Sequence, residues 1–191
     1  PEFDLFVKEV VREMTAKAGQ KCTAIRRIVV PESRVEAVGA AIAGKLGATT
    51  IGDPRDPATR MGALVSRAQR ADVLAKAAMI AAEAERVFGD PETFEVQGAD
   101  AEAGAFLPPM LFRCADPDGA VKVHETEAFG PVSTLMGYRD LPHAIEIANR
   151  GQGSLVASVI THDTAVAREV ALGAGAFHGR LYFNDRVSMQ E

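Results

Sequence analysis

The sequence predicts an α/β protein with an open, mostly parallel β-sheet and helices on both faces. Helical and strand patterns alternate along the chain, which is typical of layered α/β domains. The run SLVASVIT (154–161) is apolar almost throughout, as in a parallel strand covered on both faces. No short hairpin turn separates the expected core strands. With 191 residues, of which 47% are hydrophobic, the chain is long enough to bury a sizeable core.

The first third contains two expected helices around one strand. Apolar residues recur at helical spacing over 3–18, and Gly19 suits the position after a helix, where positive φ carries little penalty. Residues 28–30 form a short apolar run that Pro31 closes, which predicts a buried strand. A second amphipathic helix is expected over 35–46.

The middle third is expected to be looser. The stretch 52–62 has the Asp-Pro and Gly composition of a loop. A long helix is predicted over 66–87 with Ser66 as its N-cap, followed by an exposed excursion over 89–105. Residues 106–112 are apolar but contain two prolines, so they are expected to form an edge strand at best.

The last third returns to regular alternation. Strands are predicted at 132–138, 154–161 and 179–184. The first two are separated by a helix that ends at Gly151, and the last two by a helix that Asp163 caps.

Composition and charge exclude several classes of function. The chain has 21 basic and 26 acidic residues, a net charge of −5, which gives no general attraction to nucleic acid. No apolar run is long enough to span a membrane. The chain opens PEFDLF, without Met and without a signal-peptide pattern, so we expect a piece of a longer cytoplasmic protein. The two cysteines match no zinc spacing and the four histidines form no i, i+4 pair, so no metal site is predicted.

The stretch AGQKCTAIRR (18–27) places Cys22 between a helix end and a core strand. A thiol held there is fixed in position, which favours chemistry over the alternative of buried filler. Lys21, Arg26 and Arg27 lie nearby, and a positive field would favour a nucleophilic thiolate. Ion pairing at a strand edge is the simpler interpretation of the two arginines, and binding of an acidic CoA substrate is the other.

A second stretch, HETEAFGPVS (124–133), puts an acidic pair at a turn before a strand. Glu125 and Glu127 would share one face if the segment is extended. Taken by itself, this pattern favours an ordinary exposed acidic turn over a functional site.

Taken in order, GQKC, TAIRRIVVP, MGALVS, EAFGPV and SLVASVIT resemble the aldehyde dehydrogenase superfamily over essentially all 191 residues. The resemblance is greatest to the aldehyde dehydrogenase part of the PaaZ-type bifunctional ring-opening proteins of phenylacetate degradation. That group pairs an NADP-dependent semialdehyde dehydrogenase with a separate hydratase-like domain.

The resemblance implies a role for three residues. Cys22 would be the nucleophile, Glu127 would hold the nicotinamide ribose hydroxyls and Phe129 would pack near the nicotinamide. It implies NADP or NAD as cofactor and a CoA-linked semialdehyde as substrate. The substrate would be oxidised through a thiohemiacetal and a thioester on Cys22. Both motifs should then approach the same cleft.

The sequence departs from the family in what it lacks. No Glu-Leu-Gly-Gly motif and no Gly-x-Gly-x-x-Gly loop occurs in it. In the family, the general base, the oxyanion-binding Asn, the phosphate-binding Lys and the dinucleotide domain lie upstream. We therefore expect 1–191 to be a single catalytic domain that works with a missing cofactor domain, as a homo-oligomer when complete.

Three other interpretations stay open. The enzyme could act on a different semialdehyde, as in benzoyl-CoA breakdown. A thiol hydrolase or acyltransferase would need a His partner for Cys22. A non-catalytic interaction module is the third.

Overall fold

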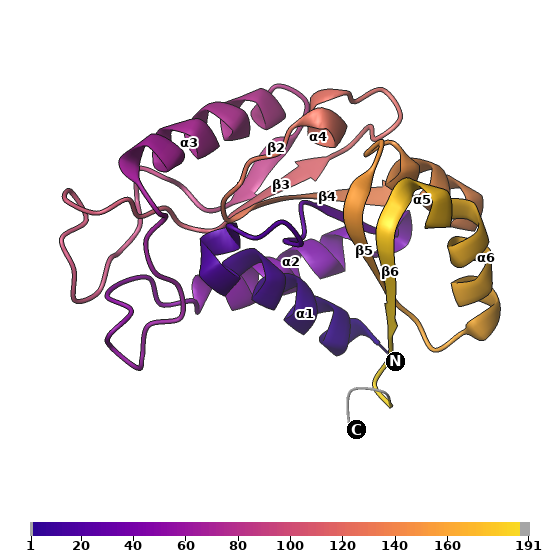
Figure 1. Cartoon of the computed structure of the whole chain (residues 1–191), viewed down its shortest axis with the longest axis horizontal. Coiled ribbons are helices and arrows are strands. Elements are labelled where there is room, and N and C mark those ends of the chain that lie inside the picture. Colours follow the sequence, from indigo (N-terminus) through magenta and orange to yellow (C-terminus); the bar gives the residue numbers. More distant parts are fainter. Residues whose placement is uncertain (1, 188–191) are drawn as a thin grey trace.

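The computed structural model describes residues 2–187; the predicted domain of 1–191 also includes residue 1 and residues 188–191, which lie outside this part. The described residues form two sheets (Figure 1). The larger has the order β1-β4-β3-β2, in which β1, β4 and β3 are parallel and β2 is antiparallel to β3. The smaller pairs β5 with β6 in parallel. The strands are β1 (Arg27–Pro31), β2 (Glu85–Phe88), β3 (Met110–Cys114), β4 (Val132–Tyr138), β5 (Ser154–Ile160) and β6 (His178–Asn184).

Helices cover both faces of the larger sheet (Figure 1). On one face, Leu111 of β3 packs in the same cluster as residues of α1 and α2. On the other face, Met110 and Phe112 pack with residues of α3 and α4. This alternation follows from the two-residue repeat of a strand, and it confirms the predicted fold class. The helices are α1 (Phe3–Thr15), α2 (Val35–Gly47), α3 (Arg67–Ala81), α4 (Lys122–Glu125), α5 (Leu141–Asn149) and α6 (Thr164–Ala174), with short 3₁₀ turns η1 (Ala16–Gly19), η2 (Glu32–Arg34) and η3 (Gly175–Phe177).

Both predicted helix caps are confirmed. Ser66 accepts a hydrogen bond from the backbone N–H of Gln69 at 3.0 Å. Asp163 accepts from the N–H groups of Ala165 and Val166 at the start of α6. Each cap satisfies donors that have no partner inside the helix.

The predicted helix over 66–87 is wrong at its end. It stops at Ala81, and Glu85–Phe88 forms β2, which hydrogen-bonds along β3. Ala84 and Val87 continue the helical spacing, but the open edge of β3 offers the backbone an alternative set of partners. Glu83, between the two elements, accepts from the N–H groups of Val121 and Lys122 and so caps α4.

Two strand predictions also need correction. The segment 106–112 does not end in an edge strand: its two prolines precede β3 (Met110–Cys114), which pairs with β4 on one side and with β2 on the other. Strand β5 is not covered on both faces: Leu155 is 50% exposed. The reason is that β5 belongs to the smaller sheet and lines a wide cleft against β1.

The register of β1 and β4 positions the site. Arg27 pairs with Thr134, and the two strands run in parallel. Cys22 precedes β1, and Glu127 precedes β4, by the same number of residues. Both motifs therefore lie at the amino ends of neighbouring strands, at one edge of the sheet. None of the helices in the part of the chain that the structure describes is long and apolar enough to cross a membrane.

Candidate active site

The thiol turn begins in an unusual backbone conformation. Lys17, Ala18 and Gly19 have φ values of 54°, 51° and 68°. All three lie in the left-handed region, which residues other than glycine rarely adopt. Gln20 fixes the exit from this bend: its amide donates to the Lys17 carbonyl at 3.1 Å and accepts from the N–H of Val65 at 3.0 Å. Cys22 follows in a turn with its side chain exposed.

Gly19 also brings the two motifs into backbone contact. A Cβ atom at this position would overlap the carbonyl group of Gly130 and the nitrogen of Pro131. The Gly-Pro part of the second motif therefore packs directly against the end of the first. Only a residue without a side chain allows this approach.

Strand β4 holds the segment between Cys22 and β1. The Ser133 hydroxyl donates to the Ile25 carbonyl at 2.6 Å, and the Thr134 N–H donates to the Arg26 carbonyl at 2.8 Å. The backbone leading from the thiol is thus fixed by the strand that follows the acidic motif.

Glu127 lies in the irregular segment between α4 and β4. Its carboxylate forms an ion pair with Arg26, with 2.5 Å between Oε1 and Nη1, and its side chain remains 49% exposed. Cys22, Arg26 and Glu127 line the same cleft, which has a volume of about 990 Å³. The structure thus places two of the three predicted site residues on one cleft.

Phe129 differs from the other two. It is half-buried and is not part of the lining of this cleft. Its backbone carbonyl accepts from the side-chain amide of Gln69 at 2.9 Å, which fixes the segment to α3. Its predicted contact with a nicotinamide ring stays a prediction.

The cations near Cys22 are all engaged elsewhere. Lys21 forms an ion pair with Glu13 of α1 at 2.6 Å, and Arg26 pairs with Glu127. Arg27 points into the protein and donates to the carbonyls of Ile147 and Ala148, at the end of α5. The three cationic side chains that were expected to create a positive field around the thiol are therefore engaged in ion pairs and hydrogen bonds. The Arg26–Glu127 pair also joins the two motifs.

Arg27 joins the thiol segment to the acidic one through His124. Its guanidinium lies 3.3 Å from His124 Nδ1, while His124 Nε2 lies 2.9 Å from the Pro117 carbonyl. A carbonyl only accepts and a guanidinium only donates, so His124 carries its proton on Nε2 and is neutral. Burial, followed by the charge of Arg26, lowers the pKa of Arg27 to about 10. Burial is also the main cause that lowers the pKa of His124, and the charges of Arg27 and Arg150 act in the same direction.

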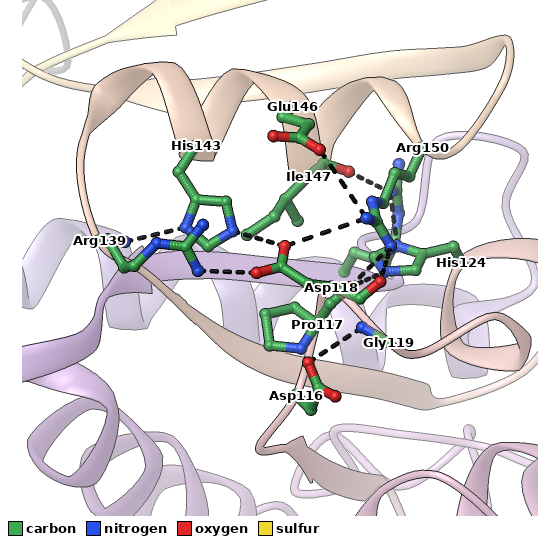
Figure 2. A network of polar contacts seen from close by, with 11 residues as sticks. Asp116, Pro117, Asp118, Gly119, His124, Arg139, His143, Glu146, Ile147 and Arg150 are labelled. Carbon is green, nitrogen blue, oxygen red and sulfur yellow. Dashed lines mark hydrogen bonds and ion pairs between the residues drawn. The ribbon is translucent and has the colours of Figure 1, made fainter.

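A second polar network supports the turn that receives His124 (Figure 2). Asp118 accepts from Arg139 Nη1 at 2.7 Å and from His143 Nε2 at 2.9 Å. These hydrogen bonds, with that from Arg139 first, lower the pKa of Asp118 to about 2. The network ties the Pro117–Asp118 turn to the end of β4 and to α5.

Several residues of this arrangement carry no signal in the sequence. Gln69 contacts the second motif from α3, outside both motifs. His124 and Ser133 lie within the second motif, but nothing in the sequence predicts their contacts with Arg27 and Ile25. The sequence predicts Gly19 only as a helix-ending residue. Among residues 2–187, no three His, Cys, Asp or Glu side chains gather closely enough to hold a metal ion.

Comparison with known proteins gives a family match over nearly the whole chain. The model of the aldehyde dehydrogenase family matches residues 2–191. A 3,4-dehydroadipyl-CoA semialdehyde dehydrogenase of Aromatoleum evansii is 48% identical over 185 residues, which cover 97% of this chain and 36% of that protein. Protein MaoC of Klebsiella aerogenes is 43% identical over 132 residues, 69% of this chain and 38% of that protein. The chain thus spans little more than a third of the length of these relatives.

The fold has close counterparts among solved structures. A betaine aldehyde dehydrogenase from Staphylococcus aureus in complex with NAD⁺ superposes with a TM-score of 0.86 and 26% identity. The match covers 96% of this chain and 35% of that one.

Proposed function

Because the chain belongs to the aldehyde dehydrogenase family, we propose that it forms the thiol-bearing part of an NAD(P)-dependent dehydrogenase. The proposed reaction oxidises a CoA-linked semialdehyde to the corresponding acid. The observation that carries the proposal is that Cys22 and Glu127 line one cleft. The similarity to a CoA-semialdehyde dehydrogenase supports this substrate class.

In the proposed mechanism, the Cys22 thiolate attacks the aldehyde carbon and forms a thiohemiacetal. The hydride on that carbon would then leave to NAD(P)⁺, which supplies the acceptor when bound. The thioester left on Cys22 is hydrolysed by water, which releases the acid and restores the thiolate. The exposed position of Cys22 suits attack on a substrate entering the cleft.

Glu127 fits the cofactor by the chemistry of its side chain. A carboxylate can accept hydrogen bonds from both hydroxyls of a ribose, and that of Glu127 is about half exposed on the cleft. Phe129 does not line this cleft, so its packing against the nicotinamide rests on the family resemblance alone. The rest of the cofactor site would come from a dinucleotide domain elsewhere in a longer, homo-oligomeric protein of the cytoplasm.

More specifically, we propose that the enzyme works in phenylacetate degradation and uses NADP as its cofactor. A semialdehyde of a benzoyl-CoA type of pathway is the alternative substrate. No observation favours the thiol hydrolase, because each histidine has a hydrogen-bond or ion-pair partner other than Cys22.

The test uses the full-length protein that contains this chain, with 3,4-dehydroadipyl-CoA semialdehyde as substrate and NADP or NAD as acceptor. Cys22→Ala should abolish NADPH formation, whereas Cys114→Ala should retain it because Cys114 is buried in the core. Removal of the CoA group from the substrate should lower kcat/KM. Dehydrogenase activity in the Cys22→Ala variant would refute the proposal.

A further inference from the structure

Among the residues that the structure describes, the Arg26–Glu127 pair is the only ion pair or side-chain hydrogen bond between the segment around Cys22 and the proposed cofactor carboxylate. Among residues 2–187, Glu127 has no other ion pair or side-chain hydrogen bond. It also lies in a segment without regular secondary structure. Its carboxylate would therefore sample many positions if Arg26 were absent.

Arg26, in contrast, stands on a fixed backbone. Its carbonyl accepts from the Thr134 N–H at 2.8 Å, and the preceding Ile25 carbonyl accepts from Ser133 at 2.6 Å. Both residues immediately precede the β1–β4 ladder, whose first pair is Arg27 with Thr134. The backbone that carries the Arg26 side chain is thus held in place by the same strand that follows Glu127.

From this geometry we infer that Arg26 is a positioning residue for cofactor binding, which holds the Glu127 carboxylate aimed into the cleft. The inference rests on the proposed role of Glu127. The pair occupies Oε1 through Arg26 Nη1, and a carboxylate has about four lone-pair sites in all. Acceptance of the ribose hydroxyls is therefore compatible with an intact ion pair.

The benefit lies in the entropy of binding. A free glutamate side chain loses rotamer freedom when a ribose fixes it, and this loss weakens binding. Arg26 imposes that loss before the cofactor arrives. Removal of the guanidinium should therefore weaken dinucleotide binding by about 3- to 10-fold. The rate of the chemical step at saturating cofactor should not change, because Arg26 contacts neither substrate nor thiol in this role.

The experiment measures the Kd for NADPH of the full-length protein by fluorescence titration, together with kcat and the KM for aldehyde. Arg26→Ala should raise the Kd for NADPH about 3- to 10-fold and leave kcat and the KM for aldehyde unchanged. Arg26→Lys keeps the charge but not the fork of donors, and should fall between the wild type and the alanine variant. The matched control is Arg34→Ala, which removes the same charge from the lining of the same cleft.

The double variant separates this inference from the proposed function. Glu127→Gln should weaken NADPH binding, and Arg26→Ala should add nothing in the Glu127→Gln background. If Glu127→Gln binds NADPH like the wild type, the cofactor role of Glu127 is wrong. If Glu127→Gln weakens binding but Arg26→Ala does not, or Arg34→Ala has the same effect as Arg26→Ala, the positioning role is wrong while the proposed function stands.

Discussion

Cys22 and Cys114 occupy opposite environments within one chain. Cys22 is exposed in a turn, whereas Cys114 is 2% exposed at the end of β3. Burial raises the pKa of the Cys114 thiol, so it stays protonated at neutral pH. The neighbouring Arg113 does not offset this effect, because it pairs with Glu36 and Glu85 on the surface.

We expect a thiol reagent such as iodoacetamide to modify Cys22 well before Cys114. The thiolate is the reactive species, and Cys114 lacks both exposure and a lowered pKa. Timed labelling followed by peptide mapping measures the two rates. Denatured protein, in which both thiols are accessible, is the control. Earlier modification of Cys114 in the folded protein would contradict the prediction.

His124 makes the stability of the fold depend on pH. Its pKa in the folded protein lies below the ordinary value of 6.5, so the unfolded chain binds a proton more readily than the native one. The free energy of unfolding should therefore fall as the pH decreases from about 6.5 toward the folded pKa, and level off below it. Urea unfolding at several pH values measures this. His124→Gln should flatten the dependence in that window; an unchanged slope would show that other groups cause it.

At the scale of elements, the contact between the thiol turn and the Gly-Pro segment is the least tolerant part of the site. It combines a left-handed backbone at Gly19 with close packing on Gly130. A residue with a Cβ atom would be strained in this backbone conformation, and it could not pack so closely on Gly130 without a shift of the backbone. The position of Cys22 relative to Glu127 therefore depends on this glycine.

We predict that Gly19→Ala destabilises the protein by at least about 1–3 kcal/mol, the usual penalty for strained backbone. The overlap with the Gly130 carbonyl adds to it. Chemical unfolding measures the loss. The control is Gly44→Ala in α2, where a Cβ atom meets nothing within 4 Å, and where alanine should be neutral or stabilising. Equal stability of the Gly19→Ala variant and the wild type would contradict the structural account.

At the scale of the whole molecule, the described site contains a thiol and a carboxylate but not a complete set of catalytic groups. The sequence carries no Glu-Leu-Gly-Gly motif and no phosphate-binding glycine loop. The resemblance assigns the general base, the oxyanion-binding Asn and the cofactor domain to a different part of the family's chain. Ligand sites of this kind form between domains.

The 191-residue chain by itself should therefore produce no NADPH from an aldehyde, although Cys22 should still react with thiol reagents. Without the other groups, a thiohemiacetal has no nearby hydride acceptor and a thioester has no base to promote its hydrolysis. Absorbance of NADPH in the presence of aldehyde and NADP measures turnover. The full-length protein is the positive control. Robust NADPH formation by the isolated chain would contradict the claim that the other catalytic groups lie outside it.

The sequence by itself determined the fold class, several of the elements and the two motifs. Helical spacing in α1, the Ser66 and Asp163 caps, and the β4 segment depend only on neighbouring residues, so they can be recognised locally. The order of motifs also predicted the family, which the family match confirms. The end of α3 was wrong because pairing of β2 with β3, a non-local interaction, overrode a helical pattern.

Only the tertiary structure decided how the two motifs meet. The parallel pairing of β1 with β4 connects segments separated by most of the chain, and no local pattern specifies that partner. This pairing sets Cys22 and Glu127 at one edge of the sheet, and it creates the Arg26–Glu127 ion pair and the Gly19–Gly130 contact. It also turns Arg27 inward toward α5, away from the thiol. Short sequence motifs therefore identify the candidate groups, whereas long-range strand pairing determines which of them share a site.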